Sequence, residues 1–241
     1  MPLTTRQNEI LKAIIEEHIE CAQPIASIEL VKKRGLRVCG ATVRNIMSDL
    51  VKLGYLKMVH VSSCRTPTDR AYRHYISELM SEDELSVLEE VAIKQKIMSE
   101  RYELERLLLS TAEVLSEITG TIALAMTSDG YIAYTGTSRI LNVPEFFELD
   151  VARSVFKLLD DYELAMSVLG KTDTIDNVSV LIGREIELAN MEPVSLISSH
   201  CQISGGQCYI GMIGPSRIRY SRIIPIVRYV SNLLSEVGEN L

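Results

Sequence analysis

Residues 41–60 read ATVRNIMSDLVKLGYLKMVH, and this stretch decides how the first part of the chain folds. Its apolar residues recur every three or four positions, which is the spacing of one buried helix face. They are Val43, Ile46, Met47, Leu50 and Leu53. Gly54 ends this pattern, and from Tyr55 onward apolar and polar residues alternate as in a β-strand. The stretch therefore predicts a helix over residues 41–53 that leads directly into a strand.

The polar residues of this predicted helix fall outside its apolar face and lie near its start. They are Thr42, Arg44, Asn45 and Ser48. Arginine and asparagine side chains read guanine and adenine edges in the major groove of DNA, and small hydroxyls reach phosphates. An outward polar face is also what an ordinary solvated helix shows. The pattern alone leaves both a DNA-reading helix and a solvated helix open.

Two helical patterns precede this stretch. Thr4 and Gln7 have the spacing of a capping box, so a helix is expected to begin there. A short second helix is expected from Ser27 to Arg34, with Gly35 as its stop. Three short helices, of which the third presents polar side chains, match the helix-turn-helix arrangement, in which the last helix enters the major groove.

The residues after the predicted recognition helix have the pattern of a β-hairpin. Residues 55–60 alternate, residues 62–65 form the tip, and the chain returns through residues 66–68. A hairpin at this place is the wing of a winged helix, and its tip suits phosphates or the minor groove. Another helix is expected after Thr68. The expected DNA-backbone contacts are Lys57, Ser62, Ser63, Arg65 and Arg73.

Charge is divided unevenly along the 241 residues of the chain. Residues 1–75 hold 12 Lys and Arg against 7 Asp and Glu, a net charge of +5, so the remainder carries −12 of a total of −7. A basic segment beside an acidic one indicates a nucleic-acid-binding module attached to a sensing or assembly module. Two solvated surfaces of uneven composition are the alternative.

The acidic part of the chain mixes helical and strand patterns. Ser81 and Glu84 have capping-box spacing, and a helical pattern runs from there to Ile118. This long helix is expected either to connect two domains and contribute to a dimer contact, or to pack only on its own domain. Strands interleaved with helices then predict an α+β domain. The strands are expected at residues 121–127, 131–137, 178–182, 194–199 and 207–213, and a terminal helix at 220–236.

The composition excludes several classes of protein. Five cysteines at scattered positions indicate free thiols, and no ligand set has the spacing of a structural zinc site. The four histidines are spread along the chain without a nucleophile or metal-ligand motif, so we expect no enzyme, no cofactor and no metal. Apolar runs are too short to span a membrane and a secretory signal is lacking, so a cytoplasmic protein is expected.

The first part of the chain resembles the winged-helix domain of the HrcA family of bacterial heat-inducible transcription repressors. The motifs that carry the resemblance are Leu3-Thr4-x-Arg6-Gln7-x-Glu9-Ile10-Leu11, Pro24-Ile25-x-Ser27, Ala41-Thr42-Val43-Arg44-Asn45, Leu53-Gly54 and Arg65-x-Pro67-Thr68-x-x-x-Tyr72-Arg73-x-Tyr75. Two positions depart from the family pattern. Cys39-Gly40 stands where small hydroxyl residues are usual, and Cys64 replaces the usual glycine of the wing tip.

The second part resembles the GAF-like regulatory domain of the same family. The motifs are Gly136-x-x-x-Ile140-Leu141-x-x-Pro144-Glu145-Phe146, Ile182-Gly183-x-Glu185, Ser195-Leu196-Ile197 and Gly211-x-Ile213-Gly214-Pro215-Ser216-Arg217-x-x-Tyr220. Ile186 stands where the family usually has asparagine. The chain is compressed between Thr119 and Tyr134, where typical members carry a long segment with a dimerisation subdomain. It therefore resembles a short form, which would dimerise through what remains, including the long helix.

The resemblance implies a repressor of chaperone operons that binds double-stranded DNA at an inverted-repeat operator as a homodimer, with the chaperonin as a modulator. A second interpretation stays open: a winged-helix regulator of another operon, controlled by a small molecule bound in the GAF-like half. In either case we expect a winged-helix domain at residues 1–78 and a GAF-like domain at residues 119–241, joined by a helix at residues 81–118.

Overall fold

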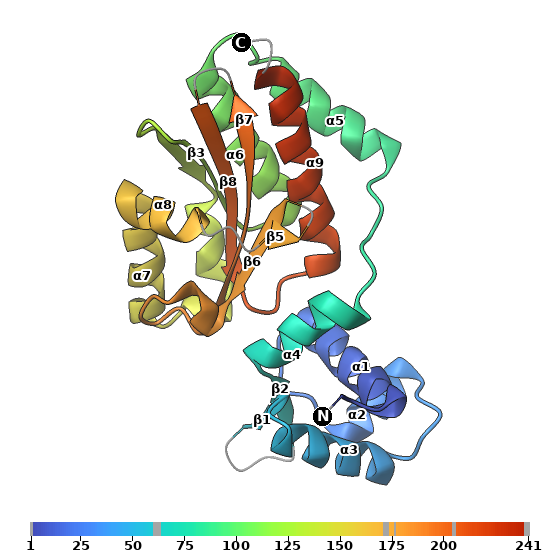
Figure 1. Ribbon diagram of the computed structural model, residues 1–241. Coiled ribbons are helices and arrows are strands. Elements are labelled where there is room, and N and C mark those ends of the chain that lie inside the picture. Colours follow the sequence, from blue (N-terminus) through green and yellow to red (C-terminus); the bar gives the residue numbers. More distant parts are fainter. Residues whose placement is uncertain (1, 60–63, 171–173, 176, 204–205, 239–241) are drawn as a thin grey trace. The chain divides into compact units, whose positions relative to one another are not determined.

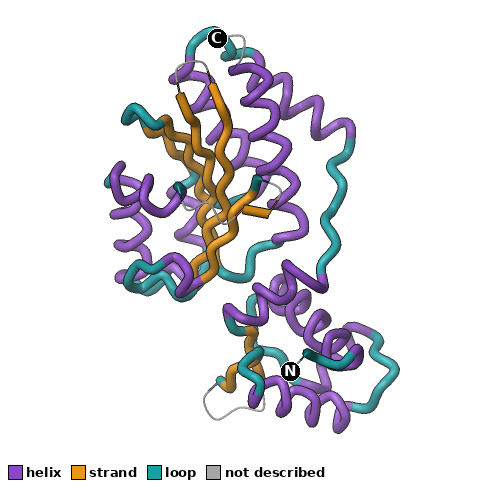
Figure 2. Tube along the Cα trace, viewed as in Figure 1, coloured by secondary structure: helices purple, strands orange, loops and turns teal. Residues whose placement is uncertain are grey.

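The protein divides into two compact units, Met1–Ser81 (unit 1) and Glu82–Leu241 (unit 2). The computed structural model describes residues 2–59, 64–170, 174–175, 177–203 and 206–238 (Figure 1 and Figure 2). Unit 1 is mainly helical, and unit 2 combines helices with an antiparallel sheet. The predicted α+β class is therefore confirmed.

Unit 1 consists of short helices around a two-stranded sheet. The helices are α1 (Thr5–Cys21), α2 (Ser27–Arg34), α3 (Gly40–Lys52) and α4 (Asp69–His74), which continues as a π-helical turn at Tyr75–Leu79. The strands β1 (Leu56–Met58) and β2 (Arg65–Pro67) pair antiparallel. The predicted start of α1 is confirmed, because the Thr4 hydroxyl accepts from the Gln7 N–H and the Gln7 side chain accepts from the Thr4 N–H. The predicted bounds of α2 are confirmed as well.

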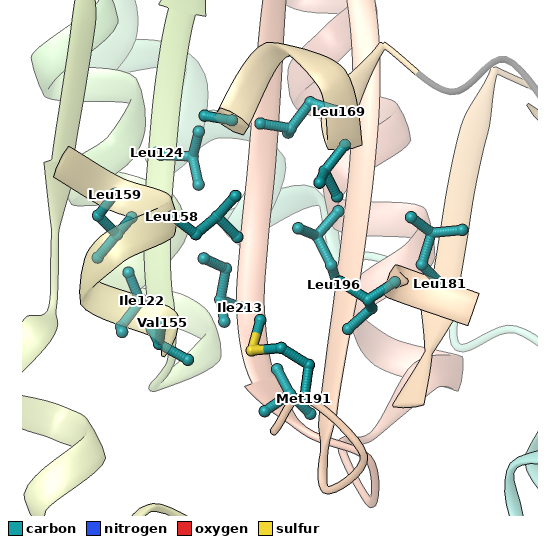
Figure 3. Packing of buried hydrophobic residues seen from close by; sticks show 14 of the residues in the cluster. Ile122, Leu124, Val155, Leu158, Leu159, Leu169, Leu181, Met191, Leu196 and Ile213 are labelled. Atoms are coloured by element: carbon teal, nitrogen blue, oxygen red, sulfur yellow. The ribbon is translucent and has the colours of Figure 1, made fainter. Parts of the chain in front are cut away.

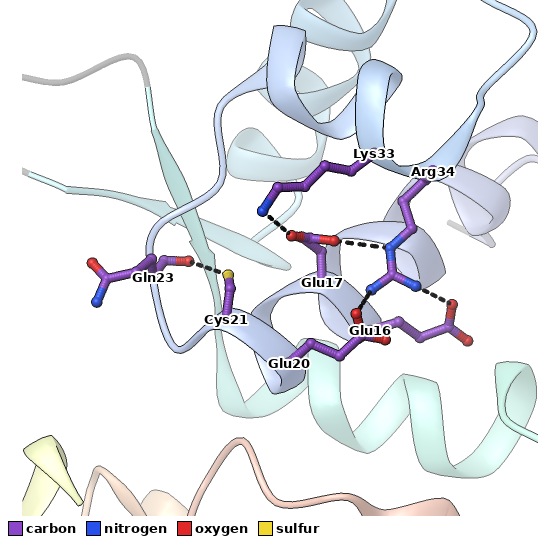
Figure 4. Close-up of polar contacts among 7 residues, drawn as sticks. All are labelled: Glu16, Glu17, Glu20, Cys21, Gln23, Lys33 and Arg34. Carbon is purple, nitrogen blue, oxygen red and sulfur yellow. Dashed lines mark hydrogen bonds and ion pairs between the residues drawn. The ribbon is translucent and has the colours of Figure 1, made fainter.

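A buried carboxylate holds α2 against α1 (Figure 4). The Glu17 side chain is only 6% exposed and accepts hydrogen bonds from Lys33 Nζ at 2.7 Å and Arg34 Nε at 3.0 Å. Glu20 also contacts the Arg34 guanidinium, at 2.8 Å. The hydrogen bond from Lys33, assisted by Arg34, lowers the pKa of Glu17 although burial opposes this. Glu17 therefore stays ionised and fixes α2 relative to α1.

We expect Glu17→Gln to destabilise unit 1 by about 2 to 3 kcal/mol, less than for a fully buried pair because Lys33 is partly solvated. The lowered pKa of Glu17 means that its contribution is present above its ordinary pKa of 4.5 and is lost as the pH falls through its folded pKa. Hydrogen exchange of the α1 and α2 amides in the full chain measures the effect. Glu16→Gln is the matched control, because Glu16 lies 4.0 Å from Arg34, and a loss as large as that of Glu17→Gln would contradict the assignment.

Unit 2 is built on a six-stranded sheet in the order β4-β3-β8-β7-β6-β5, with every neighbouring pair antiparallel. The strands are β3 (Ile122–Thr127), β4 (Ile132–Thr135), β5 (Thr174–Ile175), β6 (Val178–Ile182), β7 (Val194–Ile203) and β8 (Gly206–Pro215). The helices are α5 (Val87–Met98), α6 (Leu104–Thr119), α7 (Leu149–Asp160), α8 (Tyr162–Leu169) and α9 (Tyr220–Gly238). Short 3-10 turns lie at Thr137–Asn142, Pro144–Phe146 and Gly183–Ile186. The predicted strands and terminal helix are confirmed, and β7 and β8 are longer than predicted.

Helices cover both faces of this sheet (Figure 1). On one face α7 and α8 pack through a continuous apolar cluster that includes Leu124, Leu158 and Leu196 (Figure 3). On the other face α6 and α9 cover the alternate residues of the strands, and there the hydroxyls of Ser195 and Tyr220 lie 2.5 Å apart. Side chains that alternate along β7 therefore serve two separate layers, as expected for a sheet buried on both faces.

The single helix expected over residues 81–118 is wrong. Helix α5 begins at Val87, where Ser86 and Glu89 form the reciprocal capping box that had been assigned to Ser81 and Glu84. Residues 99–103 turn the chain, and α6 returns beside α5. Two helices with separate apolar faces bury more surface as a hairpin than as one straight rod.

The apolar stripe from Leu104 to Ile118 packs inside unit 2. Leu108 and Leu115 are fully buried, and Ser110 Oγ donates to the Lys96 carbonyl at 3.3 Å across the α5–α6 hairpin. The sequence left open whether this stripe contributes to a dimer contact or packs on its own domain. The structure supports packing on its own domain. Most of the stripe is therefore used for packing within unit 2, and Ile118 at its end is 38% exposed.

A proline in α9 provides the attachment for the segment before α5. Pro225 has no N–H, so the Ser221 carbonyl four residues earlier lacks its helical donor. The Asp83 N–H donates to that carbonyl at 2.8 Å instead. The segment is thus held to α9 through the Ser221 carbonyl. Any residue other than proline at position 225 would donate its own N–H to that carbonyl within the helix.

Gly136 is required by both its backbone and its neighbours. Its φ of +81° is a left-handed conformation, and a Cβ there would lie 2.1 Å from Ser116 Oγ, which itself donates to the Thr121 carbonyl at 2.7 Å. We expect Gly136→Ala to lower the free energy of unfolding by about 3 kcal/mol through combined strain and overpacking. Gly120→Ala is the control: its φ is +70° and its Cβ would meet nothing within 4 Å, so about 1 kcal/mol is expected. Equal losses in urea titrations would contradict the steric argument.

Candidate nucleic-acid interface

Helix α3 presents most of the predicted base-reading side chains to solvent. Its inward residues Val43, Met47 and Leu50 are buried against the rest of unit 1. Thr42, Arg44 and Asn45 are exposed, as predicted. The remaining predicted residue differs, because Ser48 is half-buried and its hydroxyl donates to the Arg44 carbonyl at 3.0 Å. Ser48 therefore bonds to the helix backbone, and the other three side chains form an outward polar face.

Cys39 is the N-cap of α3, a role that the sequence pattern did not identify. Its Sγ lies 3.2 Å from Thr42 Oγ1. This hydrogen bond to the Thr42 hydroxyl, together with backbone N–H groups at the helix start, lowers the pKa of the exposed Cys39 thiol. The thiol stands where a capping hydroxyl is usual, but it makes no capping hydrogen bond to the α3 backbone, and its contact is with the exposed Thr42 side chain.

The two-stranded sheet after α3 is held to the rest of unit 1 by backbone pairing. Ile25 and Arg65 exchange two hydrogen bonds, Ile25 N to Arg65 O at 2.8 Å and Arg65 N to Ile25 O at 2.9 Å. The Arg65 side chain is half-buried and its Nη1 donates to the Cys64 carbonyl at 3.0 Å. Lys57 on β1 is exposed, as a phosphate contact requires. Ser62 and Ser63 lie outside the described residues.

Helix α4 carries two arginines, Arg70 and Arg73. Arg70 donates to the Leu53 carbonyl at 2.9 Å and its guanidinium stacks 4.5 Å from the Tyr55 ring centroid, which ties α4 to the end of α3. Arg73, a predicted backbone contact, is half-buried. Arg70 therefore fixes α4 to the end of α3, and Arg73 exposes only part of its side chain.

Ion pairing sorts the cations of unit 1 into two groups. Several are neutralised by carboxylates, at Arg6–Glu9, Lys52–Asp49 and Glu17 with its two partners. Over the described ranges, no carboxylate pairs with Lys32, Arg37, Arg44 or Lys57. These four lie at the end of α2, in the α2–α3 connection, on α3 and on β1. Lys32 and Arg37 were not predicted as DNA contacts. Nothing in the Lys32–Arg37 stretch of the sequence indicates which of its cations pair with a carboxylate.

Several histidines and cysteines have structural partners. His18 Nδ1 lies 2.7 Å from the Tyr72 hydroxyl, and Cys21 Sγ donates to the Gln23 carbonyl. Buried Cys201 faces Cys208 across the β7–β8 pair, while His200 points to the other side of the strand. In the part of the chain that the structure describes, three or more His, Cys, Asp or Glu side chains nowhere gather as a metal site.

The motifs of the second half form a structural cluster. Arg217 donates from Nε and Nη2 to the Glu145 carboxylate at 2.5 and 3.0 Å, and both side chains are largely buried. Tyr220 donates to the Ser216 carbonyl at 2.7 Å in the same turn. These contacts fasten the start of α9 to the 3-10 turn before α7, so the motif residues stabilise unit 2. Each helix within the described ranges is too short or too polar to cross a lipid bilayer.

A family model matches most of the chain. The model described as "HrcA protein C terminal domain" matches residues 58–224, which is more than half of the chain. The chain belongs to the HrcA family. The relatives of this HrcA chain are named transcription repressors, which agrees with the expectation that it is not an enzyme. A solved protein described as hypothetical has a TM-score of 0.78 to it over 99% of both chains at 18% identity, and so shares its fold.

The named relatives are longer than this HrcA chain. "Heat-inducible transcription repressor HrcA" of Clostridium tetani is 24% identical over 344 residues, covering 100% of this chain and 96% of the relative. The protein of the same name from Bacillus pumilus is 25% identical over 341 residues, with 99% of each covered. The protein of the same name from Clostridium acetobutylicum is 31% identical over 208 residues, covering 82% of this chain and 59% of the relative. Because 241 residues fill an alignment of 344, the predicted short form is confirmed.

The lowered pKa of Cys39 predicts faster alkylation near neutral pH than an ordinary exposed thiol shows, because the thiolate is the reacting species. Thr42→Val removes the hydrogen bond of Thr42, so it should shift the pH profile of Cys39 alkylation upward and slow the reaction at pH 7 by about threefold. Iodoacetamide labelling followed by mass spectrometry measures this. Cys208 is the internal control, since burial and the neighbouring Cys201 raise its pKa and it should stay unlabelled in the folded protein. Identical profiles for wild type and Thr42→Val would contradict the role of Thr42 in lowering the pKa of Cys39.

Proposed function

We propose that this HrcA chain is a sequence-specific DNA-binding repressor whose unit 1 is a winged-helix reader. The observation that carries the proposal is the coincidence of an outward Thr42, Arg44 and Asn45 face with cations that lack carboxylate partners among the described residues. Arginine and asparagine offer base-edge hydrogen bonds, and unpaired cations release counterions from phosphates. The relatives named as heat-inducible transcription repressors support the same conclusion.

Each element then has a distinct part in recognition. Helix α3 enters the major groove with Arg44 and Asn45 toward base edges and Thr42 toward a phosphate or base edge. Lys57 on the wing, together with Arg37 and Lys32 before α3, contacts the DNA backbone and sets the register without reading sequence. Ser62, Ser63 and Arg65 were predicted for the same task, and Arg65 fits it less well because its side chain is half-buried. Arg73 fits it less well for the same reason.

We further propose an inverted-repeat operator of chaperone genes as the target and a homodimer as the binding form. Unit 2 is the GAF-like regulatory part in this proposal, and the chaperonin is the modulator that the family resemblance suggests. A two-fold protein on an inverted repeat matches one reading unit to each half-site.

Selection of bound sequences from a random duplex pool tests the proposed function. The expected result is one inverted repeat that also lies upstream of chaperone genes in the genome that encodes this chain. Recovery of no common sequence would reject sequence-specific reading. Recovery of an inverted repeat upstream of unrelated genes would reject the chaperone operons as targets.

Asn45→Ala should weaken binding to the selected sequence by about 1 to 3 kcal/mol, because a bidentate contact to adenine is lost. Binding to a scrambled duplex of equal length should change far less. Mobility-shift titrations on both duplexes measure the difference. Equal losses on the two duplexes would reject a base-reading role for Asn45.

Lys57→Ala should weaken binding to selected and scrambled duplexes alike and reduce the slope of log affinity against log salt by about 1. Arg6→Ala is the matched control, because Arg6 is also a surface cation of unit 1 but is paired with Glu9 at 2.6 Å. It should leave the slope unchanged. A slope that responds to Arg6→Ala and not to Lys57→Ala would place the DNA surface elsewhere.

A further inference from the structure

Helix α5 exposes an apolar surface on its outer side. Val87 is 74% exposed, Leu88 is 83% exposed and Val91 is 46% exposed. Ala92 is exposed beside them, and together these residues span the first turns of the helix. Residues at spacings of three and four share one helix face, so they form a single outer α5 face rather than scattered exposed side chains.

The inner side of α5 buries Ile93 and Ile97, and one of its acids is held by a partner in α9. A surface helix normally turns its carboxylates to water and its apolar residues inward. Glu89 is instead paired with Arg222 of α9, and this contact with the guanidinium lowers the pKa of Glu89 to about 2. The neighbouring segment is fixed in the same way by the pair of Glu82 with Arg228 at 2.5 Å. These ion pairs help to fix the orientation of α5, and its exposed Val87, Leu88 and Val91 cost stability in a monomer because they meet water.

We propose that the outer α5 face is the contact with a second copy of this chain, packed antiparallel about a two-fold axis. The proposal rests on the proposed function, because a repressor on an inverted repeat requires two copies. It assigns the contact to Val87, Leu88 and Val91 in place of the buried Leu104 to Ile118 stripe. A two-fold contact uses the same surface from both subunits, which a single self-complementary helix face provides.

The polar residues at the two ends of the face fit this antiparallel packing. Glu84 lies just before α5 and Lys94 lies in its second half; both are exposed, and neither forms an ion pair with any residue that the structure describes. The antiparallel register that sets Val87 against Val91 of the partner subunit also sets Glu84 against Lys94 of the partner subunit. The same register thus packs the apolar residues against each other and brings opposite charges together. The two-fold axis repeats each of these contacts once.

The length of the connection to unit 1 agrees with the spacing of DNA half-sites. Unit 1 ends at Ser81 and α5 begins at Val87. Such a connection spans at most about 20 Å. Two connections and the distance of about 10 Å between packed helices therefore let the ends of the two reading units lie up to about 50 Å apart. Half-sites one helical turn apart are about 34 Å from centre to centre, which this reach covers.

The size of the outer α5 face sets the expected strength of the contact between the two copies. Three apolar side chains on each subunit bury less than the roughly 800 Å² per partner of a standard interface. The pairing is therefore weak in solution and strengthens when two reading units bind adjacent half-sites, which hold the α5 helices close to each other.

Leu88→Glu tests the contact, and Leu149→Glu is its matched control, because Leu149 is 77% exposed at the start of α7. Both substitutions replace exposed leucines, so both proteins should fold. The probes are a duplex with the selected inverted repeat and a duplex with one half-site scrambled. Leu88→Glu should weaken binding to the inverted repeat at least tenfold and leave binding to the single half-site within twofold. Leu149→Glu should match the wild type on both duplexes.

Charge exchange tests the register. Lys94→Glu and Glu84→Lys should each weaken binding to the inverted repeat by about threefold, and the double variant should restore it, as expected for weak solvent-exposed pairs. A purely structural role of either residue predicts no such restoration. Losses that add in the double variant would overturn the antiparallel register.

The outcomes separate this contact from the proposed function. If the wild type selects no common sequence, the proposed function fails before α5 is tested. If the wild type binds the inverted repeat cooperatively and Leu88→Glu does the same, the α5 contact is wrong and the repressor function stands. If Leu149→Glu alone abolishes cooperative binding, the two copies meet at α7 instead.

Discussion

The packing of unit 1 depends on one buried charge. Glu17 can remain ionised inside unit 1 only because Lys33 and Arg34, at the end of α2, bring their charges to it. That pairing orients α2 and turns two neighbouring cations toward α1. Lys32 and Arg37, which flank the pair in the sequence, keep their charge for the surface beside the start of α3. One interaction therefore sets both the packing of the helices and the position of the positive potential.

A second constraint acts in unit 2. Pro225 leaves the Ser221 carbonyl without a helical donor, and the Asp83 N–H takes that place. The chain that leaves unit 1 is thereby fixed on α9 before α5 begins, and the pair of Glu89 with Arg222 fixes the rotation of α5 about its own axis. The outward direction of Val87 and Leu88 follows from these polar contacts together with the burial of Ile93 and Ile97 on the inner side of the helix.

Local signals in the sequence predicted most of unit 1 and failed in the segment after it. Thr4 with Gln7 and the apolar spacing around Val43 gave correct helices, because caps and periodicity act over a few residues. Ser81 with Glu84 and Ser86 with Glu89 carry the same capping pattern, and only the contacts with α9 select the second. For the site, the exposure of Arg44 and Asn45 was predictable from the helix face. The burial of Arg65 and the free charge of Arg37 were not, since partners distant in sequence decide both.

The short chain changes how specificity and pairing are related. A repressor with a large dimer interface is already paired before it meets DNA, and its affinity reflects both half-sites at any concentration. In a chain whose pairing surface is one face of α5, DNA contributes the pairing energy, because two bound reading units raise the effective concentration of their α5 helices to about the millimolar range. A single half-site then holds one copy weakly, and only an inverted repeat with matching spacing is occupied firmly. The small interface therefore makes the spacing of the operator part of what the protein reads.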